Sequence, residues 1–325
     1  MEVYRNFEEW KAPESGCAMV LGRFDGVHLG HRELLERTVA IAKDRGILAA
    51  CFSFSEITYP GAKHRGILIT DAEKENILED IGIDVLLNPD FKPPIIDTSH
   101  GDFVNGFMIG RWHTKVILAG FDFRFGYKRL GDSDFLKEEA GKSGVDVVII
   151  EPVRRGEILI KGSRIRAMIC DGEIEHANLF LGRPYSVTTH GESGRGLGNK
   201  IGFPTINLPW PDKKVEPRFG VYAVQVGVKK ITGDKTEIIP GTISGVANFG
   251  IRPTVDEHRT DPILEVHLFD PGEMIDVIGN PPLKDVLLTT EFIGFVRPER
   301  KFESVENLKE QIKLDAERAR EILRA

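Results

Sequence analysis

Short apolar runs alternate with longer stretches of helical spacing along the first half of the chain. Each apolar run has the length of a buried strand, and the runs cover residues 18–21, 47–54, 85–87, 115–120 and 145–150. Helices are predicted between them, over residues 32–43, from the capping box at 70–73 onward, over 102–109 and over 135–140. Strands that alternate with helices indicate parallel βαβ units in an α/β doubly wound sheet. Such sheets bind ligands at the carboxyl ends of their strands.

The pattern changes near residues 182–184 (Gly-Arg-Pro). Beyond this point the chain is rich in Gly and Pro, and its apolar positions predict closely spaced strands. These strands cover residues 221–228, 263–269 and 286–296. Strands with turn signals between them favour a small antiparallel β-barrel, and the amphipathic segment from Ser304 onward predicts a C-terminal helix. We therefore expect two domains, residues 1–182 and residues 183–325, with the boundary between 180 and 186.

Composition and charge narrow the class of protein. Hydrophobic residues make up 41% and charged residues 29% of the 325 residues, as in a soluble globular protein with room for two domains. The net charge of −7 and the pI of about 5.8 argue against a general nucleic-acid-binding protein, because a phosphate backbone requires clustered Lys and Arg. Cys17, Cys51 and Cys170 fit neither a zinc site nor a disulfide framework, so we expect three reduced thiols in a cytoplasmic protein. Neither a secretory signal peptide nor a membrane-spanning run is predicted.

Residues 22–31 (Gly-Arg-Phe-Asp-Gly-Val-His-Leu-Gly-His) connect the first predicted strand to the first predicted helix. An α/β sheet offers a phosphate site here, because the N–H groups at a helix start favour an anion. Gly30 permits close backbone approach, and His28 and His31 can stabilise charge on an α-phosphate and a leaving pyrophosphate. Two histidines near a helix start can also be surface residues or caps, but the surrounding strand, loop and helix favour a nucleotide site. The spacing differs from a Walker A loop, and the chain contains no GxxxxGK[ST].

This stretch resembles the adenylyltransferase half of the prokaryotic bifunctional riboflavin kinase/FAD synthetase family. Residues 120–132 (Gly-Phe-Asp-Phe-Arg-Phe-Gly-Tyr-Lys-Arg-Leu-Gly-Asp) resemble the flavin-side loop of the same family. The resemblance implies an HxGH nucleotidyltransferase-like fold for the first domain. It also implies catalytic roles for His28 and His31, ATP or phosphate binding by Gly22, Phe24 and Gly30, and flavin binding by Asp122 and Phe123. Alternating Phe residues at 121, 123 and 125 are also what an ordinary strand would carry.

The first half departs from the family pattern at several places. The family's Pro-His-Pro after the second strand is absent, and the chain has residues 52–60 (Phe-Ser-Phe-Ser-Glu-Ile-Thr-Tyr-Pro) there. The family's Ser-Ser-Thr-x-Ile-Arg phosphate clamp becomes Lys-Gly-Ser-Arg-Ile-Arg, in which Lys161, Ser163 and Arg166 are the candidate phosphate-binding residues. Arg23 replaces the family's Asn. The altered clamp either binds phosphate through different groups or supports a slower adenylyl transfer.

Residues 182–325 resemble the riboflavin kinase domain over its whole length. The glycine-rich loop 190–198 is weak evidence alone, but residues 202–207 (Gly-Phe-Pro-Thr-Ile-Asn) match the family's Gly-Phe-Pro-Thr-Ala-Asn with one change. The resemblance implies that Thr205 and Asn207 supply oxygens to Mg²⁺, a cation that prefers oxygen ligands. It implies ATP or phosphate binding by a further set of residues, which are Gly191, Gly198, Lys200 and Pro204.

Glu265 lies in the segment that holds the family's proposed base. By resemblance it would deprotonate the ribityl terminal hydroxyl for in-line attack on the γ-phosphoryl group, whereas on its own it could equally be a solvated carboxylate. Asn248 and the pair Arg297 and Glu299 are weaker flavin-binding candidates. A surface ion pair is the alternative role for Arg297 and Glu299.

The resemblance therefore implies an enzyme that phosphorylates riboflavin to FMN and adenylylates FMN to FAD. Its substrates would be riboflavin, FMN and ATP with Mg²⁺, and no nucleic acid or membrane partner is expected. Two alternatives stay open: a riboflavin kinase with a degenerate adenylyltransferase domain, and a flavin- or nucleotide-binding regulator without turnover. The HxGH signature alone would also allow a transferase for another alcohol or nucleotide substrate, which the riboflavin kinase-like half does not favour. The oligomeric state is not predicted.

Overall fold

The chain folds into two compact units. The computed structural model describes residues 1–55, 66–192, 203–232, 235–251, 262–270, 272, 278 and 283–324. Unit 1 comprises Met1–Arg164 and unit 2 comprises Ile165–Ala325. The predicted domain boundary at 182/183 differs from this division by two helices, which fall almost entirely in unit 2. They are α5 (Gly162–Asp171) and α6 (Ile174–Leu181).

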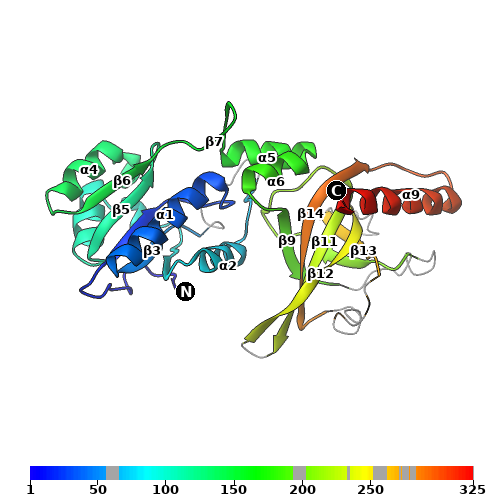
Figure 1. The fold of residues 1–325 in the computed structure, drawn as a ribbon, viewed down its shortest axis with the longest axis horizontal. Helices are drawn as coiled ribbons and strands as arrows, with labels where there is room; N and C mark the ends of the chain where they lie inside the picture. Colours follow the sequence, from blue (N-terminus) through cyan, green and yellow to red (C-terminus); the bar gives the residue numbers. More distant parts are fainter. Residues whose placement is uncertain are drawn as a thin grey trace. The chain divides into compact units, whose positions relative to one another are not determined.

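Unit 1 is built on a six-stranded parallel sheet with the strand order β1-β4-β3-β2-β5-β6 (Figure 1). The strands are β1 (Glu2–Tyr4), β2 (Cys17–Leu21), β3 (Leu48–Phe52), β4 (Val85–Leu87), β5 (Thr114–Gly120) and β6 (Asp146–Ile150). Strand order runs from β2 outward to β4 and then restarts at β5 on the other side of β2. The point between β2 and β5 is therefore the topological switch point, where doubly wound sheets bind ligands.

Helices cover both faces of this sheet. They are α1 (Leu29–Arg45), α2 (Asp71–Ile81), α3 (His100–Asp102), which continues as a π-helix (Phe103–Ile109), and α4 (Ser133–Gly141). Short 3₁₀ turns lie at Ile95–Asp97 and Tyr127–Arg129, and a small hairpin pairs β7 (Arg154–Arg155) with β8 (Ile158–Leu159). Alternate residues of β2 serve the two faces: Met19 packs with the π-helix and α4, and Val20 packs with α1 and α2. The predicted α/β doubly wound fold is confirmed.

The capping box predicted at the start of α2 is present. Thr70 Oγ1 accepts from the backbone N–H of Glu73 at 3.2 Å, and Glu73 Oε2 accepts from the backbone N–H of Thr70 at 2.8 Å. Helix α1 starts three residues earlier than predicted. His28 is its N-cap, and its imidazole Nδ1 accepts from the backbone N–H of His31 at 3.3 Å.

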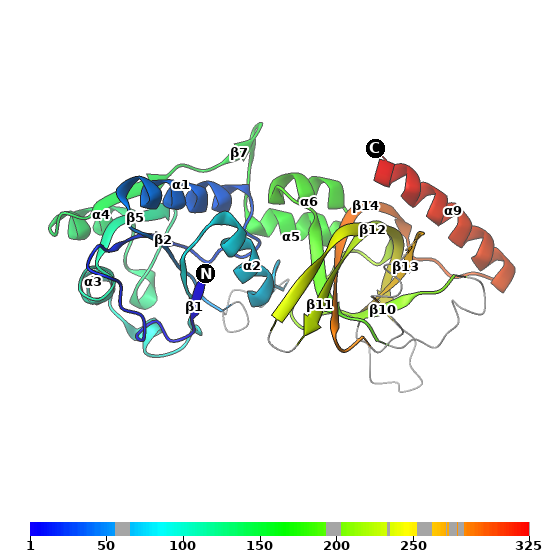
Figure 2. The ribbon, with the colours of Figure 1, turned by 60° about the horizontal axis from the view of Figure 1, so that its bottom comes forward.

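Unit 2 is a curled antiparallel sheet with the order β10-β13-β12-β11-β14-β9 (Figure 2). The elements are β9 (Tyr185–His190), β10 (Ile206–Pro209), β11 (Gly220–Thr232), β12 (Lys235–Ile251), β13 (Pro262–Leu268), β14 (Val286–Pro298) and the C-terminal helix α9 (Val305–Arg324). An isolated antiparallel bridge between Glu192 and Asn207 links the end of β9 to the β10 edge. Ala316 and Ala319 of α9 pack on one face, against Val221 and Ala223 of β11. The predicted antiparallel barrel with a C-terminal helix is confirmed as a curled, partly closed sheet.

Two glycines with positive φ, Gly16 just before β2 and Gly46 at the end of α1, give a test of the packing in unit 1. Gly16 and Gly46 both have positive φ (+83° and +65°), but only at Gly16 would a Cβ clash, 2.3 Å from the His113 carbonyl oxygen. We expect Gly46→Ala to lower the free energy of unfolding by about 1 kcal/mol, from backbone strain alone. Gly16→Ala should lower it by about 3 kcal/mol, because the clash also displaces β2 from β5.

Urea unfolding checks this in a Trp210→Phe background, so that fluorescence from the buried residues Trp10 and Trp112 reports unit 1 alone. Equal losses in the two alanine variants would contradict the steric argument.

Candidate functional site

The HxGH loop, residues 22–31, leaves the carboxyl end of β2 and enters α1. The His28 and His31 rings stack with their centroids 3.7 Å apart and their planes 13° apart. The edge of Phe24 also meets the His31 ring, at 5.3 Å between centroids. The two histidines singled out from the sequence therefore lie together at the N-terminus of α1, where backbone N–H groups favour an anion.

The backbone of this loop is held in a strained form. Phe24 and Val27 have left-handed φ values of +56° and +35°, and the Phe24 side chain is fully buried. Gly22 fits over the Phe24 ring, since a Cβ at Gly22 would lie 2.8 Å from Phe24 Cζ. Asp25 Oδ1 accepts from the backbone N–H of Leu68 at 2.8 Å. Such strain persists only where surrounding contacts determine the backbone, and it concentrates at functional sites.

A cavity of about 550 Å³ opens at the switch point between β2 and β5. We call it the switch-point cavity. Its walls come from the HxGH loop, the ends of β3 and β5, the 3₁₀ turn after β4 and the loop 120–132. The lining residues are Leu21, Gly22, Arg23, Phe24, His31, Leu34, Phe52, Phe54, Phe91, Ile95, Ile96, Asp97, Thr98, Phe103, Gly120, Asp122, Phe123, Arg124, Phe125, Gly126, Tyr127, Lys128 and Arg129. The volume is in the range of small-molecule and cofactor sites.

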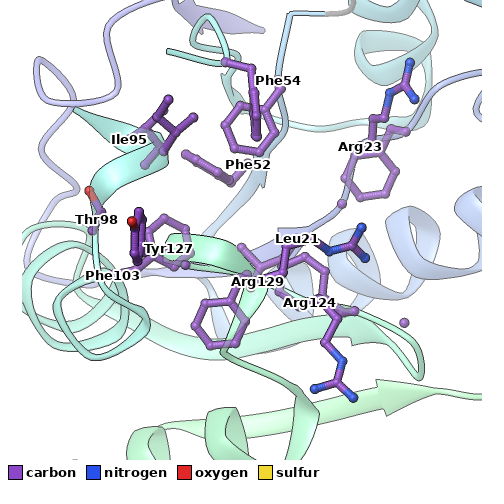
Figure 3. Close-up of a pocket in the computed structure, with 18 of the residues that line it drawn as sticks. Leu21, Arg23, Phe52, Phe54, Ile95, Thr98, Phe103, Arg124, Tyr127 and Arg129 are labelled. Carbon is purple, nitrogen blue, oxygen red and sulfur yellow. The ribbon is translucent and has the colours of Figure 1, made fainter. Parts of the chain in front are cut away.

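The cavity is aromatic on one side and cationic on the other. Figure 3 shows Phe52, Phe54 and Ile95 on the side away from the side chains of Arg23 and Arg124. We call the apolar side, formed by Phe52, Phe54, Phe91 and Phe103, the aromatic wall. An aromatic wall suits a flat heteroaromatic ring, and guanidinium groups suit phosphate oxygens.

Among the predicted residues of unit 1, Gly22, Phe24 and His31 line the cavity from the HxGH loop, and Asp122 and Phe123 line it from the loop 120–132. His28 and Gly30 are in the same loop but outside the lining. Lys161 precedes α5 and Ser163 lies in its first turn, whereas Arg166 belongs to unit 2.

The aromatic wall was not predicted, because its residues come from separate segments that only the sheet topology brings together. The alternation of Phe52 and Phe54 at the end of an apolar run was the one available signal.

In unit 2, three predicted residues form a row across adjacent strands. Glu265 of β13 pairs in register with Asn207 of β10 on one side and with Asn248 of β12 on the other. Residues opposite one another on neighbouring strands share a face, with Cβ atoms about 5 Å apart. We call Asn207, Glu265 and Asn248 the polar row. Asn207 is buried and the other two are half-buried.

Segments that flank the polar row place further predicted residues nearby. The Pro204 carbonyl oxygen lies 2.8 Å from His267 Nδ1, and since a carbonyl only accepts, this nitrogen carries the proton. The contact ties the exposed residues Pro204 and Thr205 to β13. Gly191 packs tightly, because a Cβ there would lie 2.6 Å from Leu283 Cδ1. The candidates Gly198 and Lys200 lie outside the described residues.

Arg297 is engaged with the C-terminal helix. Its Nε donates to Asp315 Oδ1 at 2.8 Å and its Nη2 donates to Asp315 Oδ2 at 2.7 Å, and Asp315 is buried. The Glu299 carboxylate packs over Gly250, where a Cβ would lie 2.8 Å from Glu299 Oε1. The structure thus gives Arg297 an ion-pair role, and flavin binding by Arg297 and Glu299 stays a prediction.

Comparison with known proteins matches both units. The FAD synthetase family model matches residues 11–164, and the riboflavin kinase family model matches residues 181–323. A bifunctional riboflavin kinase/FMN adenylyltransferase of Bacillus subtilis is 30% identical over 95% of this chain and 93% of its own length. The corresponding Escherichia coli K12 protein is 32% identical over 96% of this chain and 94% of its own length.

The chain belongs to the bifunctional riboflavin kinase/FMN adenylyltransferase family.

A solved structure covers the same span. A crystal structure described as a macrolide-efflux protein from Streptococcus pneumoniae superposes with a TM-score of 0.80, at 27% identity over 98% of both chains. In the part of this chain that the structure describes, no helix has the length and apolar character needed to cross a membrane. Within this family member, the switch-point cavity falls inside the FAD synthetase match and the polar row falls inside the riboflavin kinase match.

The Arg297–Asp315 pair gives a test of how α9 is held on the riboflavin kinase unit. We expect Asp315→Ala to lower the free energy of unfolding of unit 2 by about 3 kcal/mol, because it leaves a largely buried guanidinium without its carboxylate. The matched control is Glu317→Ala on the exposed side of the same helix, which should change stability by no more than about 0.5 kcal/mol. Thermal unfolding measures both in a Trp10→Phe, Trp112→Phe background, in which Trp210 fluorescence reports unit 2 alone. Equal effects would show that the ion pair does not anchor the helix.

Proposed function

We propose that the chain phosphorylates riboflavin to FMN in unit 2 and adenylylates FMN to FAD in unit 1, using ATP with Mg²⁺ in both reactions. The observation that carries the proposal is the convergence of separate motif residues at each place. Three segments of unit 2 meet in the polar row, and the HxGH loop and the loop 120–132 of unit 1 meet in one cavity. Family membership over nearly the whole chain supports the same pair of reactions.

In unit 2, the carboxylate of Glu265 would accept the proton of the ribityl terminal hydroxyl. The hydroxyl oxygen then bonds to the γ-phosphorus of ATP, the bond from that phosphorus to the β-phosphate bridging oxygen breaks, and ADP leaves. Asn207 and Asn248 pair with Glu265 from the two neighbouring strands and would hold its carboxylate toward the substrate on that face of the sheet. The Thr205 hydroxyl and the Asn207 amide oxygen would hold the Mg²⁺ of the ATP complex, because that ion prefers oxygen ligands.

In unit 1, an oxygen of the FMN phosphate would attack the α-phosphorus of ATP, and pyrophosphate would leave. The imidazoles of His28 and His31 and the N–H groups at the start of α1 would stabilise the charge that develops on the phosphate oxygens. The aromatic wall and Phe123 would hold the isoalloxazine ring, and Arg23 and Arg124 would face the phosphates. Positioning and electrostatics are sufficient for this transfer, with no covalent intermediate.

We also propose that the enzyme works in the cytoplasm, where ATP is supplied. None of the three cysteines forms a disulfide bond. Burial raises the pKa of the Cys17 thiol to about 12, so this group stays protonated and unreactive at neutral pH.

Incubation of the purified protein with riboflavin, excess ATP and Mg²⁺, followed by chromatographic separation of flavins, tests both reactions. FMN and FAD together are the expected products. If the reaction stops at FMN even when FMN is supplied directly, unit 1 is degenerate and the riboflavin kinase alternative is correct. If neither product forms, the protein is a binding protein.

Replacing the base tests the assignment in unit 2. Glu265→Gln keeps the size and a hydrogen-bonding end but cannot accept the proton, so kcat for FMN formation should fall about 100-fold or more. FAD formation from supplied FMN should stay unchanged in the same preparation, which controls for protein concentration. An unchanged KM for riboflavin reports that unit 2 is folded. An unchanged kcat for FMN formation would remove Glu265 from the mechanism.

Replacing a histidine tests the assignment in unit 1. His31→Ala should lower kcat for FAD formation from FMN by about 100-fold, since it removes a hydrogen-bond donor to the developing charge. Riboflavin phosphorylation serves as the reference activity and should keep its wild-type rate. A variant with full FAD synthesis would show that the cavity acts without the HxGH histidine.

A further inference from the structure

A polar cluster is buried beside the switch-point cavity, at the carboxyl ends of β3 and β4. Its centre is Lys74 of α2, whose side chain is fully buried. Lys74 Nζ donates to the Phe54 carbonyl oxygen at 2.7 Å and to Ser53 Oγ at 3.3 Å, and it lies 3.6 Å from Asp71 Oδ1. Burying an ammonium group costs free energy unless the group is paired and hydrogen-bonded. These contacts therefore compensate the buried charge of Lys74 and hold its side chain in place.

The direction of the hydrogen bonds in this cluster is fixed by chemistry. An ammonium group only donates, so Ser53 Oγ accepts from Lys74 and directs its own proton to another acceptor. That acceptor is the Arg23 carbonyl oxygen, 2.7 Å away. A continuous chain of bonds therefore runs from Lys74 through Ser53 to the backbone of the HxGH loop.

The bonded carbonyl belongs to a part of the loop that needs support. Arg23 directly precedes Phe24, which has a left-handed φ of +56° and a fully buried ring. A non-glycine residue keeps such a conformation only where its surroundings over-determine it. The hydrogen bond from Ser53 fixes the peptide unit between Arg23 and Phe24, and both residues line the cavity.

The second bond of Lys74 reaches the opposite side of the cavity. The Phe54 carbonyl that accepts from Nζ belongs to the aromatic wall. The Phe54 ring packs edge-to-face on Phe91, with centroids 5.0 Å apart. One ammonium group thus ties the HxGH loop and the aromatic wall to the same point of α2.

The cluster coincides with a departure from the family pattern. Ser53, Phe54 and Ser55 occupy the segment in which Pro-His-Pro was expected. Both hydroxyls take part in the cluster. The Ser53 hydroxyl donates to the Arg23 carbonyl oxygen of the HxGH loop, and Ser55 Oγ donates to Asp71 Oδ2 at 2.6 Å. Asn88 Nδ2 donates to Asp71 Oδ1 at 3.2 Å and completes the surroundings of the carboxylate.

We propose that Lys74 is a positioning residue for adenylyl transfer, acting through Ser53 on the HxGH loop and through the Phe54 carbonyl on the aromatic wall. The proposal rests on the proposed function of unit 1. It assigns Lys74 no contact with substrate. Its effect is to hold the two walls of the cavity at the separation that ATP and FMN require.

A pair of serine variants tests the arm that reaches the loop. Ser53→Ala removes the hydroxyl that links Lys74 to Arg23, and Ser55→Ala removes a buried hydroxyl two residues away that bonds Asp71 instead. We expect Ser53→Ala to raise KM for ATP in FAD formation about fivefold, the equivalent of one typical hydrogen bond. Ser53→Thr should restore KM to within about twofold of wild type, and Ser55→Ala should stay within the same range.

Lys74 is replaced together with Asp71, so that its removal does not leave the Asp71 carboxylate without its ion-pair partner. Lys74→Met combined with Asp71→Asn removes both charges together. We expect KM to rise about fivefold or more for FMN as well as for ATP, because both arms are lost. Riboflavin phosphorylation by unit 2 should remain at the wild-type rate in every variant and controls for protein concentration. Fluorescence of Trp10 and Trp112 in the Trp210→Phe background reports that unit 1 is folded in each variant.

The outcomes separate a positioning role from general stabilisation. The proposal is overturned if Ser53→Ala leaves KM for ATP unchanged, or if Ser53→Ala and Ser55→Ala raise it equally. If the wild-type chain makes no FAD, the proposed function of unit 1 fails instead. Calorimetric binding of ATP and of FMN to the same variants then provides the test, with Ser53→Ala weakening ATP binding and Ser55→Ala leaving it unchanged.

Discussion

The turn that follows β2 is the constraint on which unit 1 depends. Leu21 ends the strand, and within three residues the backbone places Phe24 in a left-handed conformation with its ring in the core. A buried phenylalanine in this conformation is costly, so the sequence around it must hold it in place. Gly22 leaves room for the Phe24 ring. The Asp25 carboxylate accepts a hydrogen bond from the backbone N–H of Leu68, and the Ser53 hydroxyl donates one to the Arg23 carbonyl oxygen. The position of the two histidines at the start of α1 follows from this one turn.

Unit 2 builds its site by a different physical rule. Strand register places Glu265, because residues paired across neighbouring strands share a face. A shift of β13 by one residue would turn Glu265 away from Asn207 and Asn248 and place Leu264 or Val266 in the row. Those neighbours are fully buried on the other face, so the hydrophobic core that stabilises the sheet also fixes the register of the polar row.

The sequence predicted the parts of this structure that depend on local signals. The parallel strands 18–21 and 85–87 and the capping box at Thr70 are examples, since hydrophobic runs and cap chemistry are readable over a few residues. Strand β12 was missed because Pro240 and Gly241 interrupt its pattern. The structure accommodates them in an irregularity of the β11–β12 pairing, where Gly227 pairs with Thr242 and Val228 with Ile239. The start of α1 was missed because histidine is not a common N-cap.

The functional sites also consist of parts that the sequence predicts and parts that it does not. The HxGH loop and the loop 120–132 are contiguous, so their residues could be named in advance, and the topology places both at the switch point. The aromatic wall is assembled from β3, the segment around Phe91 and the π-helix, and the alternation of Phe52 and Phe54 is the one local signal that any of these segments carries. The Lys74 cluster was invisible for another reason: a lysine in an amphipathic helix is normally predicted to face solvent, and only the carbonyl and hydroxyl groups around it reveal why it is buried.

Charge explains why the cavity needs both its backbone amides and its local cations. The chain carries a net charge of −7, whereas ATP and FMN are anions, so the overall field of the protein opposes their approach. Binding energy must then come from groups within a few ångströms of the phosphates, where the N–H groups of α1 and the guanidinium groups of Arg23 and Arg124 act over distances that salt screens little. Arg23 is itself paired with Asp25 at 3.3 Å, which holds its guanidinium on the cavity side of the loop at the cost of part of its free charge. The arrangement favours precise placement of the triphosphate over strong attraction at long range, as a transfer that relies on positioning requires.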